Sequence, residues 1–139
     1  MLVKVKQHPL SILKIANCTQ ISSKWAERLL NIFGSLKSLN ASLSSTIVTD
    51  SNCGSMSSQL EELILNEPTG LTDRGLQMIG RRNGGMLNYL QLEACTRISD
   101  SGLSYVSKLP LQTVSIKACP AITCTGTFVF WCQYRCTVF

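Results

Sequence analysis

Apolar and polar positions along this chain follow one repeated pattern, which is complete over residues 87–106. Within it Leu90 and Leu92 alternate with polar residues, and this period of two predicts a short strand with one buried face. Cys95 and Ile98 follow three and six residues after Leu92, where the chain is expected to turn back beneath the strand. A small thiol at that point acts as a compact apolar group that fits a tight, dry corner.

The second half of the pattern has the features of a helix start. Ser99 and Asp100 offer side-chain oxygens that can accept hydrogen bonds from the free amides of a first helical turn. Gly102 would let this helix lie close to the neighbouring layer, and Leu103 and Val106 are spaced to face inward. Each complete unit therefore predicts a strand, a turn and a helix.

Five such units follow one another, so the pattern predicts a repeat architecture over residues 10–126. Each unit opens with a leucine, at Leu10, Leu36, Leu60, Leu87 and Leu111. The spacings of 26, 24, 27 and 24 residues are those of a strand-and-helix repeat, for which roughly 20–29 residues are usual. The third unit has Pro68 in the cysteine position, so a thiol is not required there for chemistry.

Two units depart from the pattern. The second has one residue inserted before its helix position, which is rich in serine and glycine, so an irregular or mobile segment is expected there. Cys53 in this segment takes a leucine position and is expected to pack in the core. The first unit has Trp25 where glycine is usual, which predicts that its helix sits further out.

The two ends of the chain are interpreted apart from the repeats. Residues 1–9 resemble the end of a preceding helix and a linker. Residues 127–139 are aromatic and β-branched where a helix is expected, and they lack the polar outer face of a terminal cap. We therefore expect an atypical C-terminal tail, as in a fragment or a variant with an altered end.

Composition places the chain among globular proteins. Its 139 residues suit one domain, with 45% apolar and 15% charged residues. The net charge of +5 is spread along the chain, whereas a nucleic-acid surface concentrates its basic residues. No apolar run approaches the roughly 18 residues of a membrane span, and no signal peptide accompanies the odd number of cysteines. These features predict a cytoplasmic or nuclear protein without nucleic-acid or membrane partners.

Candidate catalytic and metal-binding groups are sparse. His8 is the only histidine and lies outside the repeats, so a cysteine or serine nucleophile would have one poorly placed base. Cys124, Cys132 and Cys136 are the alternative zinc ligands, but their spacing matches no common site and a fourth ligand is not evident. We therefore expect no catalytic residue, no metal site and no cofactor.

The unit L-x-x-L-x-L-x-x-C-x-x-I-S/T-D-x-G-L resembles the cysteine-containing leucine-rich repeats of F-box/LRR proteins, across about residues 10–126. This resemblance implies a right-handed α/β solenoid of about five repeats, with short parallel strands on the concave face and helices on the convex face. In that family the repeats recruit a substrate, while a separate F-box joins an SCF-type ubiquitin ligase. Residues 29–39 have only a faint likeness to an F-box. The alternative is an F-box-independent LRR scaffold or an assembly or regulatory factor.

If the resemblance holds, outward strand positions line the concave face. They are Lys14, Asn40, Glu62, Ile64, Asn66, Tyr89, Gln91, Glu93, Ser115 and Lys117. By the same alternation a neighbouring row comprises Ile12, Ser38, Glu62, Tyr89 and Thr113. Ordinary solvated surface is the simpler interpretation for any one residue, whereas a contact role is favoured for the set.

Tyr89 and Ile64 are the expected anchors, because they are apolar at positions predicted to be exposed. We expect a monomeric, non-catalytic protein-interaction module whose partner is another protein, such as a ubiquitination substrate. Components of the SCF ligase would be further partners if a longer form carries an F-box.

Overall fold

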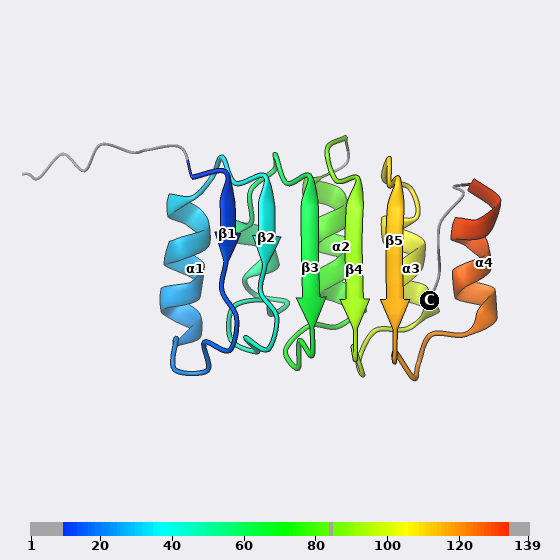
Figure 1. The fold of residues 1–139 in the computed structure, drawn as a ribbon, viewed down its shortest axis with the longest axis horizontal. Helices are drawn as coiled ribbons and strands as arrows, with labels where there is room; N and C mark the ends of the chain where they lie inside the picture. Colours follow the sequence, from blue (N-terminus) through cyan, green and yellow to red (C-terminus); the bar gives the residue numbers. More distant parts are fainter. Residues whose placement is uncertain (1–9, 84, 134–139) are drawn as a thin grey trace, which may run out of the picture.

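The computed structural model describes residues 10–83 and 85–133; the segment 1–9, which contains His8, and the end of the tail, which contains Cys136, lie outside the described residues. The fold is α/β, with one all-parallel sheet whose strands follow the order of the chain, and α2 and α3 lie behind this sheet (Figure 1). The strands are β1 (Ile12–Lys14), β2 (Ser38–Asn40), β3 (Glu62–Asn66), β4 (Tyr89–Glu93) and β5 (Thr113–Lys117). The helical segments are α1 (Ser23–Ile32), η1 (Cys53–Ser55), α2 (Asp73–Arg82), α3 (Asp100–Val106) and α4 (Cys124–Gln133).

Strand pairing keeps the spacing of the sequence units. Leu39 lies beside Leu63, and Leu63 lies beside Leu90, so equivalent leucines are neighbours in the sheet. From β1 to β5 the paired residues are 26, 24, 27 and 24 positions apart, the same series as the opening leucines. The predicted alternation is confirmed in the middle of the sheet, where Leu65, Leu90 and Leu92 are 0% exposed.

Helix starts follow the predicted capping chemistry. The hydroxyl oxygens of Ser22, Thr72 and Ser99 accept hydrogen bonds from backbone amides of their own first helical turns, at 3.4, 3.3 and 3.2 Å. Each hydroxyl thereby satisfies an amide that has no partner inside the helix. The first of these helices, α1, ends at Ile32.

Aspartates at the helix starts join successive units. The carboxylate of Asp73 accepts hydrogen bonds from the backbone amide and the hydroxyl of Ser99, at 2.8 and 2.6 Å. Asp100 accepts the same two bonds from Thr123, at 2.8 and 2.5 Å. We expected the Asp100 carboxylate to accept hydrogen bonds from amides of its own helix, α3, and this expectation was wrong. The helices start side by side, so the carboxylate reaches Thr123 at the start of the next helix, α4.

The glycine inside the first turn of α2 and α3 makes room for these carboxylates. A Cβ atom on Gly75 would stand 2.5 Å from Oδ1 of Asp50, and one on Gly102 would stand 3.1 Å from Cγ of Asp73. Asp50 binds the cap of α2 just as Asp73 binds the cap of α3. The predicted close approach at Gly102 is therefore confirmed, and its cause is the neighbouring unit's aspartate. Trp25, at the equivalent position of α1, is 59% exposed.

The second unit has a single 3-10 turn, η1, in place of a helix, which confirms its expected irregularity. Cys53 is 0% exposed, and burial, with a smaller contribution from Asp50, raises the pKa of its thiol to about 12. A thiol held protonated in the core is a packing group, as predicted. Asn52 is also buried, and its amide donates to the backbone oxygens of Thr46 and Ile47 at 3.1 and 3.2 Å.

The chain after Gly126 is helical as far as Gln133. Its low helical propensity argued against a helix here, and this indication was wrong. Phe130 explains the difference, because its side chain is 0% exposed within the core. Burial of one aromatic ring can outweigh the small propensity penalties of its neighbours. Phe128, in the same helix, is 64% exposed.

Five non-glycine residues in the turns that follow the strands have a left-handed backbone. They are Asn17, Leu43, Glu67, Ala94 and Ala118, with φ between 50° and 58°. They recur at the spacing of the units, so each unit makes the same turn after its strand. This conformation is costly for residues with a Cβ atom, and it persists where the surrounding structure enforces it.

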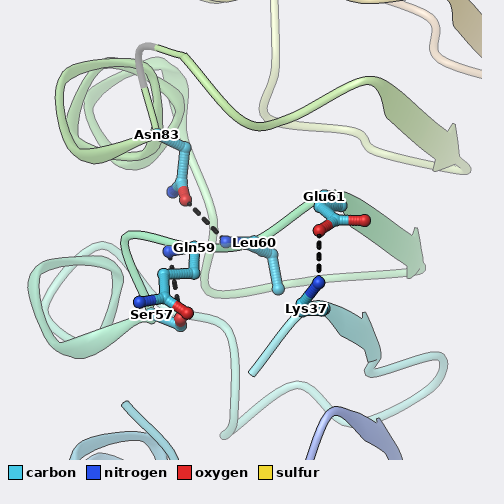
Figure 2. A network of polar contacts seen from close by, with 6 residues as sticks. All are labelled: Lys37, Ser57, Gln59, Leu60, Glu61 and Asn83. Atoms are coloured by element: carbon cyan, nitrogen blue, oxygen red, sulfur yellow. Dashed lines mark hydrogen bonds and ion pairs between the residues drawn. The ribbon is translucent and has the colours of Figure 1, made fainter. Parts of the chain in front are cut away.

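Polar contacts fix the entry into β3 (Figure 2). Asn83, at the end of α2, is 0% exposed; its Oδ1 accepts the amide of Leu60 at 3.3 Å, and its Nδ2 donates to the oxygen of Ile79 at 3.3 Å. One side chain thus ties a helix end to the start of the next strand. Beside it, Lys37 and Glu61 form an ion pair at 3.0 Å on the surface.

Candidate functional site

The outward side chains of the five strands form a continuous surface, here called the strand face. In β3 and β4 burial alternates, with inward residues buried and outward residues half-buried. None of the ten residues predicted for a binding surface is fully buried. Two are exposed, Lys14 and Lys117. The half-buried ones are Asn40, Glu62, Ile64, Asn66, Tyr89, Gln91, Glu93 and Ser115.

A hydrogen-bonded row occupies the middle of the strand face. The Tyr89 hydroxyl donates to Oε1 of Gln91 at 3.2 Å, and Nε2 of Gln91 donates to Oδ1 of Asn66 at 3.3 Å. Ile64 lies beside Gln91 in the register of β3 and β4. The sheet thus places the two expected anchors together: Tyr89 belongs to the row, and Ile64 lies beside it. Hydrogen bonds between its members fix the orientation of the side chains in the row.

The start of the strands encloses a hollow of about 460 Å³ on the same side of the molecule. It is lined by Ser11, Ile12, Lys37, Ser38, Glu61, Glu62, Asn88 and Tyr89. Four of these belong to the neighbouring row predicted from the alternation; Thr113 is outside the lining. The hollow therefore gathers an aromatic ring, an exposed isoleucine and two carboxylates.

Ser38 corrects one expectation within this row. It was expected to point outward to solvent, yet it is 8% exposed, and its hydroxyl donates to Oε2 of Glu62 at 2.5 Å. In the strand register Ser38 lies between Ile12 and Glu62, whose longer side chains cover the small hydroxyl. Its role is to orient the Glu62 carboxylate at the edge of the hollow.

Lys37, Glu61 and Asn88 line the hollow but were missed by the sequence reasoning. Each stands one residue before the predicted row, and the three recur at the spacing of the units. That periodicity was the available signal. Alternation alone could not reveal them, because they precede the strands and their side chains are placed by the turn that leads into the sheet.

The remaining predicted residues lie away from the hollow. Asn40 uses Oδ1 to accept hydrogen bonds from the amide and hydroxyl of Ser42, at 3.2 and 2.6 Å, and so stabilises the turn after β2. Glu93 lies beside Lys117 in the register of β4 and β5, at the far ends of these strands. Lys14 is in the edge strand β1. The structure thus separates a central set of outward-facing residues from a peripheral set.

Within residues 10–83 and 85–133, no three histidine, cysteine, aspartate or glutamate side chains are grouped so that they could hold a metal ion. Cys124 is exposed, whereas the side chain of Cys132 and all of Cys136 lie outside the described part of the chain. None of the helices in the described ranges is long and apolar enough to cross a membrane.

Comparison with known proteins adds no family assignment. No protein-family model matches the chain, and no curated protein matches it. The strand face with its polar row and hollow therefore has to be interpreted from its own geometry and from the repeated sequence unit.

Proposed function

We propose that the chain is a right-handed leucine-rich-repeat solenoid of the cysteine-containing kind, with the strand face concave and the helices convex. Two observations support this proposal: the strands follow chain order, and their register equals the unit spacing of 26, 24, 27 and 24 residues. An aspartate of the second, third and fourth units binds the helix cap of the following unit, and such contacts between neighbours are also what a stacked array requires.

The function that this architecture favours is non-catalytic binding of another protein at the strand face. The observation that carries the proposal is the row Tyr89–Gln91–Asn66 beside the hollow of about 460 Å³. Aromatic groups flanked by ordered polar groups are frequent anchors of protein interfaces. The Glu62 carboxylate at the rim suits a partner segment that presents a basic side chain next to an apolar one.

Two roles follow from the family resemblance. The first is substrate recognition for an SCF-type ubiquitin ligase; the second is a ligase-independent scaffold or assembly factor, in the cytoplasm or nucleus. The proteins captured with the chain distinguish them, because only the first role brings cullin-ligase components and stabilises the partner when the proteasome is inhibited.

The experiment is affinity capture from cells followed by mass spectrometry. The double variant Tyr89→Ala, Gln91→Ala should lose at least tenfold in recovered partner, since truncated anchors cost roughly 1–3 kcal/mol. The matched control is Tyr105→Ala, Gln77→Ala, which changes the same residue types on helices α2 and α3 and should retain the partner.

Circular dichroism of both variants establishes that each keeps its fold. Equal capture by both double variants would contradict a binding role for the strand face, as would recovery of chaperones alone in every sample.

A further inference from the structure

The turn after each strand contains one inward position that was assigned to a cysteine in the sequence unit. Along the chain this position holds Cys18, Ser44, Pro68, Cys95 and Cys119. Neighbouring units stack, so the residues at this position lie in successive layers. Only the last two layers place one thiol beside another, and this pair is not needed to explain the fold because serine and proline serve at the same position.

The backbones that carry the pair are held at sheet spacing. The amide of Ala94, one residue before Cys95, donates to the oxygen of Lys117, two residues before Cys119, at 2.9 Å. Neighbouring strands lie about 4.8 Å apart, and disulfide-linked residues usually have Cα atoms roughly 4.4–6.8 Å apart. The thiol of Cys119 also reaches across to the oxygen of Leu92, in the preceding unit, at 3.8 Å.

The two sulfurs interact and differ in access. The thiol of Cys95 donates to the backbone oxygen of Glu93 at 3.6 Å, and the thiol of Cys119 donates to the backbone oxygen of Lys117 at 3.2 Å. Cys95 is 1% exposed, whereas Cys119 is half-buried and lies in the wall of a hollow of about 290 Å³ beside Ile122 and Thr123. A small oxidant can therefore reach the sulfur of Cys119 from solvent, whereas the sulfur of Cys95 is buried next to it.

We propose that Cys95 and Cys119 form an oxidisable dithiol, which a hydroperoxide converts into a disulfide through initial attack on Cys119. With hydrogen peroxide, the Cys119 thiolate attacks one oxygen, a sulfur–oxygen bond forms, the oxygen–oxygen bond breaks, and the departing hydroxide takes up a proton to become water. The sulfur of Cys95 then attacks that of Cys119; the sulfur–sulfur bond forms, the sulfur–oxygen bond breaks, and a second water leaves with the Cys95 proton. Two thiols lose two electrons and two protons, and one peroxide becomes two waters.

Local electrostatics favour this order of events. Interaction with the neighbouring Cys95 thiol lowers the pKa of the Cys119 thiol to about 7, against burial and the nearby Glu93 carboxylate, which both raise it. The same interaction, with burial, raises the pKa of Cys95. At neutral pH Cys119 is thus the nucleophile and Cys95 the proton-bearing partner, which resolves the oxidised sulfur.

The reduced full chain is treated with hydrogen peroxide, its remaining thiols are alkylated, and the unreduced digest is examined by mass spectrometry. The expected product links the peptides of Cys95 and Cys119 and is lighter by two hydrogen atoms, while Cys18 is recovered alkylated. Linkage of Cys119 to Cys124 instead, or oxidation of Cys18 as fast as Cys119, would overturn the proposal. So would an unreacted pair under conditions that oxidise exposed thiols.

Two variants test whether residues at equivalent turn positions lie next to each other. Circular dichroism of each variant shows whether it keeps its fold. Cys95→Ala should slow alkylation of Cys119 at pH 7 by roughly tenfold, because the neighbouring thiol that favours the Cys119 thiolate is lost. Ser44→Cys gives Cys18 a thiol neighbour of its own and should create a second peroxide-dependent link, between positions 18 and 44. A folded Ser44→Cys chain without that link, or an unchanged rate in Cys95→Ala, would contradict the stacking argument.

Discussion

Ala94 illustrates how single residues store strain in this chain. Its φ of 52° lies in the left-handed region, which costs a residue with a Cβ atom roughly 1–2 kcal/mol. Glycine avoids that cost, but its greater backbone freedom stabilises the unfolded chain by about 0.4–1 kcal/mol. We therefore expect Ala94→Gly to raise the free energy of unfolding by roughly 0.5–1 kcal/mol.

Urea denaturation followed by circular dichroism measures the change at Ala94. The matched control is Ala26→Gly, in the interior of α1, which should lower the free energy of unfolding by about 1 kcal/mol. If both substitutions destabilise the chain equally, the left-handed turn is not the source of strain.

At the scale of elements, the contact between Asp100 at the start of α3 and Thr123 at the start of α4 makes the free energy of unfolding depend on pH in the acid range. The hydroxyl and the amide of Thr123 hold the pKa of the Asp100 carboxyl below its ordinary value of 3.8. A depressed pKa means that the folded state prefers the carboxylate, so this contribution is complete above the ordinary pKa and is lost as pH falls through the lower folded value.

Titration of Asp100 by NMR should therefore give a midpoint below 3.8 in the folded chain and an upward shift in Thr123→Val. Hydrogen exchange in α4 should accelerate over the same acid range, because its cap loses an acceptor. A midpoint that Thr123→Val leaves unchanged would show that the carboxylate does not depend on this contact. Thr127→Val, one turn further along α4, is the matched control.

These elements also show what a single sequence can predict. The strand around Leu90 and Leu92 was predictable because alternate burial is a local property with a period of two. The partner of Asp73 was not, since a sequence does not state which side chain stands beside a given cap. The helix after Gly126 was not predictable from propensity for a related reason: propensity is local, whereas Phe130 holds this helix through its contact with the core.

The candidate site divides in the same way. Alternation predicted Tyr89 and Gln91 as outward residues, which fixed their place in the strand face. It could not predict that these two side chains hydrogen-bond to each other, nor that Lys37 and Tyr89 line the same hollow. Those features depend on rotamers and on the turns that lead into the sheet, which the pattern of apolar positions leaves open.

For the whole molecule, the decisive property is that equivalent positions differ in burial between the β1 edge of the sheet and its centre. Leu90, in β4, is 0% exposed between two neighbouring strands, whereas its equivalent Leu13, in the edge strand β1, is only partly buried. β4 pairs with a strand on each side, whereas β1 lies at the edge of the sheet and pairs with β2.

We accordingly expect Leu90→Ala to lower the free energy of unfolding by about 3–4 kcal/mol and Leu13→Ala by about 1 kcal/mol. The larger loss combines lost burial with a cavity that strands on both sides keep open, while solvent and side-chain movement relieve the gap at the edge. Urea unfolding of the two variants under identical conditions measures the difference. Leu90→Val offers a milder central change if the alanine variant does not fold, and it should still cost more than Leu13→Val. Equal losses at the two sites would mean that β1 is covered as completely as β4 in solution, and would contradict the difference in burial between these two strands.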